Sequence, residues 1–280
     1  TNDGDGGVDT FTGIREVRGS SFTDNITGSS NNESFIGRGG NDIIDGGGGF
    51  DTIRYNRSDI DSPGVVVNLT TSLATGSFSG ISFSHTLSNI EDIKGSDFND
   101  TITGDNNNNS LNGGDGNDII NAEAGGDSID GGAGDDTITG GAGADSIDGG
   151  SGSDTFLYTT VTDSAIGGID NITDFVAGGS GDKINTNILN TLAIFGDQST
   201  GDTLANLTLT TLNALANSSS GTLTTTLSGG SDNTDVMQLT TTDSKIIWAI
   251  DVDGSGAFDV SDTIIDVTGL TGNLNVNDFV

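Results

Sequence analysis

The sequence predicts an all-β chain: a parallel β-roll (β-solenoid) of nine-residue repeats in two blocks, followed by a C-terminal β region. Three observations predict it. Eleven nine-residue units, nearly all starting with Gly, carry Ile, Leu or Phe at position eight. Position six is Asp in all but two, which have Glu33 and Asn109. Four units occupy residues 19–54 and seven occupy residues 95–157. A short fixed period indicates a stacked array whose units bury their apolar side chains against one another.

Each unit divides into a turn and a short strand. Gly-rich runs such as Gly131–Asp136 favour a turn, because Gly tolerates left-handed backbone angles. The next three residues, such as Thr137–Thr139, predict a strand with one inward side chain. Two units then make one coil, so turns on the same side lie one coil apart. We therefore expect Asp118 to lie near Asp100 and Asp136, and Asp127 near Asp145.

These stacked turns predict several Ca²⁺ sites, because carboxylate and carbonyl oxygens are the hard ligands that calcium prefers. The candidate ligands in the repeats are Asp24, Asp42, Asp51, Asp100, Gly113, Gly116, Asp118, Asp127, Gly131, Gly134, Asp136, Gly140, Gly143, Asp145, Gly149, Gly152 and Asp154. A flexible Gly/Asp linker is the alternative to a folded roll. A linker would not keep an apolar residue at every position eight, so the roll is favoured.

The charge balance also favours a cation-binding protein. The chain has 41 acidic and 8 basic residues, a formal charge of −33, and no cysteine. A compact state would repel itself without counter-ions, so calcium binding and folding are expected to be coupled. The acidity disfavours nucleic acid and anionic membranes as partners. No apolar run is long enough to span a bilayer or to resemble an N-terminal signal peptide.

A longer repeat sets the predicted domain organisation. A shift of 76 residues aligns Thr10–Asp45 with Thr86–Asn121, and the exceptions Glu33 and Asn109 coincide. The alignment predicts two separate rolls in duplicated modules. The expected domains are a first roll at 1–60, a β spacer at 61–94, a second roll at 95–157 and a C-terminal β cap at 158–280. The spacer is expected to continue or cap the core through strands at Val65–Leu69 and Ile81–Leu87.

The nonapeptides resemble those of the repeats-in-toxin (RTX) family of secreted bacterial proteins. The resemblance implies a calcium-loaded parallel β-roll. The order of Thr155–Tyr158, Asp170–Phe175 and Gly181–Ile184 is similar to the roll-closing segment of serralysin-type members. The ending Asn277–Val280 resembles the uncleaved C-terminal signal of members exported by type I secretion. The resemblance therefore implies the type I secretion machinery as a partner and an extracellular location. Since the sequence does not start with Met, we expect it to be the end of a longer protein.

The C-terminal third is read from weaker signals. Strands are expected near Val236–Leu239, Lys245–Ile250 and Thr263–Val267, whereas the Leu-rich stretch 204–215 fits a short helix or strands. The loop Asp251–Asp262 fits either an EF-hand-like calcium loop or a tight hairpin turn. Its candidate ligands are Asp251, Asp253, Ser255, Asp259 and Asp262.

Nothing in the sequence indicates catalysis. The one histidine, His85, excludes a two-histidine zinc motif in this chain, and no Gly-x-Ser-x-Gly sequence is present. His85 is expected at the surface or in packing. The favoured function is a non-catalytic, calcium-loaded structural and secretion module. The alternatives are a surface-layer (S-layer) or adhesin segment whose calcium sites drive self-assembly at the cell surface, and the C-terminal part of an RTX hydrolase such as a protease or lipase.

Overall fold

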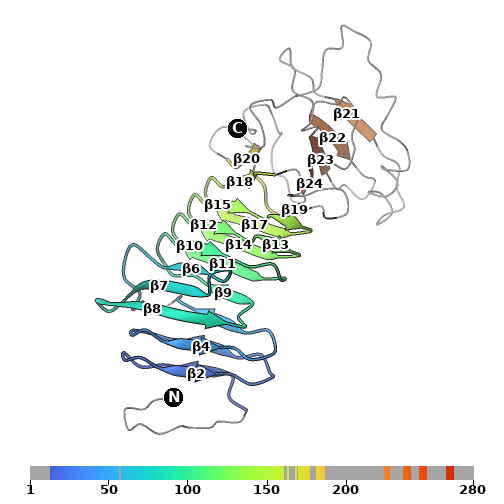
Figure 1. Cartoon of the computed structure of the whole chain (residues 1–280). Helices are drawn as coiled ribbons and strands as arrows, with labels where there is room; N and C mark the ends of the chain where they lie inside the picture. Colours follow the sequence, from blue (N-terminus) through green and yellow to red (C-terminus); the bar gives the residue numbers. More distant parts are fainter. Residues whose placement is uncertain are drawn as a thin grey trace.

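The structure is a computed structural model, and the regular elements of its described residues are all β-strands (Figure 1). It describes residues 13–56, 58–160, 163, 168, 170–176 and 181–186, together with the backbone of four strands within residues 224–267. The predicted all-β parallel roll is confirmed. The part of the chain that the structure describes contains no helix that could cross a membrane.

Two long sheets face each other and form the roll. Sheet A contains, in spatial order, β1 (Glu16–Arg18), β3 (Ser34–Ile36), β5 (Thr52–Arg54), β9 (Asp92–Lys94), β11 (Ser110–Asp115), β14 (Ser128–Ala133), β17 (Ser146–Ser151), β19 (Asp170–Ile172), β24 (Thr263–Val267), β23 (Ile246–Ile250), β22 (Val236–Thr240) and β21 (Thr224–Leu227). Sheet B contains β2 (Asn25–Thr27), β4 (Ile43–Asp45), β8 (Ile81–Ser88), β7 (Leu73–Phe78), β6 (Val66–Asn68), β10 (Thr101–Thr103), β12 (Ile119–Asn121), β15 (Thr137–Thr139), β18 (Thr155–Tyr158) and β20 (Lys183–Thr186). Two short strands, β13 (Ala124–Gly125) and β16 (Ala142–Gly143), pair separately.

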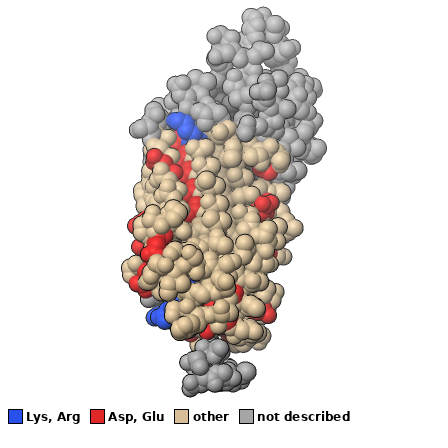
Figure 2. Space-filling model, turned by 60° about the vertical axis from the view of Figure 1, so that its left-hand side comes forward, with Lys and Arg blue, Asp and Glu red and all other residues tan. Residues whose placement is uncertain are grey.

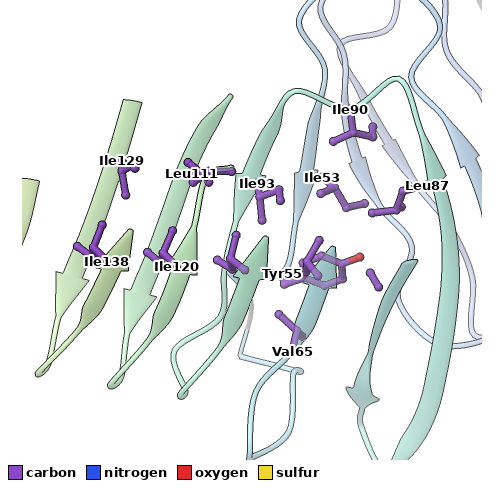
Figure 3. Packing of buried hydrophobic residues seen from close by; sticks show 14 of the residues in the cluster. Ile53, Tyr55, Val65, Leu87, Ile90, Ile93, Leu111, Ile120, Ile129 and Ile138 are labelled. Carbon is purple, nitrogen blue, oxygen red and sulfur yellow. The ribbon is translucent and has the colours of Figure 1, made fainter. Parts of the chain in front are cut away.

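Consecutive nonapeptides alternate between the two sheets, so two units make one coil. Partners in the parallel ladders are therefore eighteen residues apart, as in Leu111 with Ile129 and Ile120 with Ile138. Each short strand points only its central side chain inward, because successive residues of a strand face opposite sides. Figure 3 shows Leu111 and Ile129 of sheet A facing Ile120 and Ile138 of sheet B.

The core is a single column of these position-eight side chains. All of them are at most 3 % exposed: Ile26, Phe35, Ile44, Ile53, Ile102, Leu111, Ile120, Ile129, Ile138, Ile147 and Phe156. Burying one such side chain contributes about 1.5–3 kcal/mol. Each contributes fully only when the coils above and below it are in place, so folding of neighbouring coils is expected to be cooperative.

Glycine is required where the turns stack. Gly132 and Gly134 have φ values of +104° and +135°, which L side chains rarely adopt. A Cβ atom on Gly134 would also collide with the carbonyl oxygen of Gly116 in the preceding coil. Glycine at these two positions therefore lets their turns stack at strand spacing.

The two blocks of repeats share one roll, whereas the 76-residue alignment predicted two separate rolls. In sheet A, β5 pairs directly with β9 in parallel, with Ile53 opposite Ile93. In sheet B, the spacer supplies three strands: β8 pairs in parallel with β4, β7 is antiparallel to both neighbours, and β6 pairs in parallel with β10. Val67, Phe83 and Leu87 bring buried side chains from this spacer into the core. The sequence showed two blocks because the spacer lacks the Gly/Asp pattern, although its backbone continues the sheet.

The roll also continues one coil beyond the last nonapeptide. Ile172 of β19 stacks on Ile147, and Ile184 of β20 stacks on Phe156. In sheet A, β24 then pairs in parallel with β19, and β21–β24 form an antiparallel meander. Strands are thus found at 236–240, 246–250 and 263–267, where the sequence predicted them. The Leu-rich stretch 204–215, the loop Asp251–Asp262 and the ending Asn277–Val280 lie outside the described residues.

Candidate metal centre

The turn acids form a hydrogen-bonded ladder along each edge of the roll. On the edge that precedes sheet B, Asp118 Oδ1 accepts a hydrogen bond from the backbone N–H of Asp100 at 2.7 Å, and Asp136 Oδ1 accepts one from Asp118 at 2.7 Å. On the opposite edge, Asp145 Oδ1 accepts one from the Asp127 amide at 2.8 Å. The acids expected to be neighbours one coil apart are therefore neighbours, and each has one oxygen satisfied.

The second carboxylate oxygen has no donor in most of these turns. The buried Oδ2 atoms without a hydrogen-bond partner include those of Asp51, Asp118, Asp127, Asp136, Asp145 and Asp154. The six residues that carry these oxygens are at most 3 % exposed. A buried carboxylate oxygen without a partner is unfavourable, because burial removes its water and supplies nothing in return. These six oxygens are the strongest indication of cation sites in the turns.

Backbone carbonyls supply further oxygens at the same place. A Cβ atom on Gly113 would collide with both Asp118 Oδ2 and the carbonyl oxygen of Gly131 in the next coil. Gly131 is surrounded in the same way by Asp136 Oδ2 and the Gly149 carbonyl. Carboxylate and carbonyl oxygens therefore converge beside the first glycine of these units. Such an all-oxygen set suits Ca²⁺.

The electrostatics favour a bound cation. Burial, with smaller contributions from neighbouring carboxylates, raises the pKa of Asp118, Asp127 and Asp154 to about 7. Burial likewise raises the pKa of Asp136 to about 6. A calcium ion between the turns would offset this cost and hold the carboxylates ionised. Among the described residues no three acidic, histidine or cysteine side chains form a metal cage by themselves, so backbone carbonyls would have to complete the coordination.

The acidic surface adds to this demand for cations. Figure 2 shows Asp and Glu side chains in a stripe along one side of the roll, with few Lys or Arg side chains in view. Asp130 and Asp148, for example, lie opposite each other on neighbouring strands of sheet A and are both exposed. Divalent cations in solution would therefore be attracted to the roll before they reach the buried oxygens.

Not every predicted ligand has an oxygen to offer. Asp24 Oδ2 accepts hydrogen bonds from the Ser20 amide at 2.6 Å and the Ser20 hydroxyl at 3.0 Å. Asp100 is held in the same way by Ser96, and its Oδ1 also accepts from the Val65 amide at 2.7 Å. Asp24 and Asp100 open the two blocks, and serine supplies there the donors that the other turns lack. The structure thus makes them weaker ligand candidates than the sequence predicted.

The two exceptions at position six are also satisfied from within their own turns. Glu33 accepts from the amide and the hydroxyl of Ser29. The side-chain oxygen of Asn109 accepts from the Asp105 amide at 2.9 Å. Glu33 and Asn109 are therefore weaker candidates for cation binding than the Asp residues with a donor-free Oδ2.

The predicted glycines divide into two groups. Gly113, Gly131, Gly140 and Gly149 each lie beside the Oδ2 atom of the acid in their own unit. Gly116, Gly134, Gly143 and Gly152 have positive φ values and pack against the backbone of the preceding coil. The second group therefore shapes the turns. The predicted ligands Asp251, Asp253, Ser255, Asp259 and Asp262 lie outside the described residues.

The ladders contain three acids that the sequence analysis missed. Asp170 Oδ1 accepts from the Asp145 amide at 3.0 Å, Asp182 Oδ1 from the Asp154 amide at 2.9 Å, and Glu91 from the Asp51 amide at 2.8 Å. Each stands two residues before a buried isoleucine, namely Ile172, Ile184 and Ile93. This acid-x-Ile pattern is present even where the glycines of the nonapeptide are absent.

Comparisons with known proteins agree with this geometry. The family model described as the RTX calcium-binding nonapeptide repeat (4 copies) matches residues 18–53, 94–129 and 121–156. A search of curated proteins found no significant match.

Two solved structures illustrate the structural likeness. The AlgE6R3 subunit of a mannuronan C5-epimerase from Azotobacter vinelandii is 20 % identical, with a TM-score of 0.26, over 64 % of this chain and 77 % of that one. The extracellular lipase LipA from Serratia marcescens is 14 % identical, with a TM-score of 0.31, over 97 % of this chain and 40 % of that one.

The matched residues are the ones that form the coils and the stacked turns. Residues 18–53 and 94–156 of this chain therefore match the RTX calcium-binding nonapeptide repeat, and they fold as a parallel β-roll.

Proposed function

We propose that this chain is a calcium-dependent structural module of a secreted bacterial protein. The observation that carries the proposal is the set of donor-free Oδ2 atoms in consecutive turns, from Asp118 to Asp154. Calcium would supply the missing partner in each turn and fix the spacing of the coils. The same ions would reduce the repulsion within a chain of formal charge −33.

Calcium concentration would then act as the folding signal. In a cytosol with little calcium, the buried carboxylates would oppose collapse and the chain would stay unfolded, a state suited to type I secretion. Extracellular calcium near the millimolar range of extracellular modules would drive folding. The resemblance of the repeats and of the ending Asn277–Val280 to exported RTX proteins supports the secretion part of the proposal.

Circular dichroism in EGTA and in calcium tests the folding step. We expect a β spectrum only with calcium, and a β spectrum unchanged by EGTA would contradict the proposal. The double variant Asp118→Ala/Asp136→Ala should shift the calcium midpoint to higher concentration. Asp130→Asn is the matched control, because this exposed acid lies outside the turns and accepts from Asn112.

Light scattering during the same titration separates a folding module from a calcium-assembled one. A constant mass with growing β signal supports the folding module. Growth in mass at the calcium midpoint would favour the surface-layer or adhesin alternative.

A further inference from the structure

One coil, at the junction of the two blocks, departs from the calcium-type turn. Residues 83–88 run in parallel register with residues 40–45: Phe83 bridges Gly40, the Ser84 amide donates to Asn41 Oδ1, and Thr86 pairs with Ile43. His85 therefore stands opposite Asp42, in the place that an acid fills in the other ladders. The histidine is a substitute for the turn acid in this coil.

His85 is buried against Asp42. Its Nε2 atom lies 3.1 Å from Asp42 Oδ2, and both side chains are 0 % exposed. Its Nδ1 atom lies 3.4 Å from the hydroxyl of Tyr55, and its ring stacks on Phe83 with centroids 4.2 Å apart. Burial, and then the charge of Asp42, raises the pKa of Tyr55, so the phenol keeps its hydrogen. The imidazole is thus enclosed, and its Nε2 atom lies within ion-pair distance of Asp42 Oδ2, although neither atom makes a hydrogen bond.

At Gly37 the imidazole of His85 lies where a carbonyl oxygen lies beside Gly113. At Gly113 the converging atoms are Asp118 Oδ2 and the Gly131 carbonyl oxygen of the next coil. At Gly37 a Cβ atom would instead meet His85 Cε1 at 2.5 Å, Asp42 Oδ2 at 2.8 Å and His85 Nδ1 at 2.9 Å. β8 runs through this position as a strand, and the three atoms nearest to that Cβ include no carbonyl oxygen. The donor set does not fit calcium.

We propose that His85 takes the place of a calcium ion beside Asp42, so that this coil of the roll is held together without metal. The inference rests on the proposed function, because it assumes that calcium fills the equivalent place beside Asp118. It makes the junction between the blocks a metal-free segment of an otherwise calcium-dependent stack. Asp42, a predicted calcium ligand, is then a partner of histidine.

Nitrogen NMR of the calcium-saturated wild-type protein is the direct test. His85 is the one histidine of the chain, so its ring signals need no assignment by mutation. We expect Nε2 to carry a hydrogen that exchanges slowly with water, as its burial against Asp42 requires. A ring without a hydrogen on Nε2, or one in rapid exchange with water, would overturn the proposal, because calcium on Asp42 would have displaced it.

The dependence of the melting temperature on calcium concentration gives a second test. His85→Phe should lower the curve by the same amount at every calcium concentration, whereas Asp118→Asn should reduce its slope. A His85→Phe curve that converges on the wild-type curve as calcium rises would show competition at Asp42 and overturn the inference. A wild-type curve without slope would instead overturn the proposed function, and this inference with it.

Discussion

The two blocks of repeats have the same nonapeptide, but the chain supplies different hydrogen-bond partners to their turn acids. In residues 19–54, Asp24 and Glu33 receive serine donors, whereas Asp42 and Asp51 each keep an Oδ2 without a hydrogen bond, and His85 Nε2 lies 3.1 Å from that of Asp42. In residues 95–157, Asp100 and Asn109 receive donors from their own turns, whereas the five acids from Asp118 to Asp154 accept a backbone amide on Oδ1 and each keep a donor-free Oδ2. The same repeat position can therefore hold an acid whose oxygens accept hydrogen bonds from the chain, or an acid with an oxygen available to a cation. The hydrogen-bond donors that the next coil and position two of the same unit supply decide which of the two roles the acid has.

The largest expected effect comes from removing acids that have no protein donor. Asp118→Ala/Asp136→Ala should raise the calcium midpoint of folding at least about tenfold, equivalent to about 1.4 kcal/mol. Asp24→Ala should lower the melting temperature but leave the calcium midpoint near that of the wild type. Calcium titrations followed by circular dichroism measure both. Equal shifts of the midpoint in the two variants would break the distinction between the blocks.

A core substitution at the junction tests whether the blocks form one cooperative unit. Ile93 is fully buried and lies opposite both Ile53 of the first block and Leu111 of the second. Ile93→Ala should cost about 2–5 kcal/mol through the cavity it leaves. Hydrogen exchange should show faster opening in both blocks. Faster exchange confined to one block would mean that the continuous sheets do not couple them.

A serine substitution should make the stability around one turn acid depend more on calcium. Ser96 is buried, and Ser96→Ala removes the hydroxyl donor to Asp100 Oδ1, which leaves the Val65 amide on Oδ1 and the amide of residue 96 on Oδ2. The loss should be about 1 kcal/mol at low calcium, the usual net contribution of one hydrogen bond. Added calcium should restore part of it. A loss of stability that calcium leaves unchanged would show that Asp100 cannot accept an ion.

The pH dependence should be the smallest effect, and it has a definite sign. Burial raises the pKa of Asp118, Asp127 and Asp154 to about 7, above the usual value of 3.8. Without calcium, these groups contribute most to stability below about pH 4, and the contribution falls as pH rises to about 7. The β signal in EGTA should therefore grow on acidification from pH 7 towards pH 4. A signal that decreases over this interval would contradict the burial of these acids.

Much of the roll follows from the sequence because one short period encodes it. The strand at Thr137–Thr139, the inward Ile138 and the approach of Asp118 to Asp136 all depend on the nine-residue phase. The continuity of the sheets was not predictable in this way. β8 joins the stack with Phe83 and His85 in the places of Gly and Asp, so the pattern disappears while the backbone register persists.

The donors of individual acids were also beyond the sequence pattern. Ser20 and Ser96 stand at position two, where many residue types occur, and their effect depends on the hydroxyl rotamer. Asp170 and Asp182 belong to a coil whose turns have other lengths, so the fixed period passes over them. Position six thus predicts where an acid lies, and only the three-dimensional surroundings show whether it needs a cation.

Hydrogen exchange of the backbone amides, compared in calcium and in EGTA, tests most directly the claim that donor-free turn acids make folding calcium-dependent. The account predicts that removal of calcium abolishes protection in β12 and β15, between the turns of Asp118 and Asp136. It also predicts that at intermediate calcium, β4 and β8 beside Asp42 and His85 keep more protection than β12 and β15. Equal protection of β12 and β15 with and without calcium would contradict it.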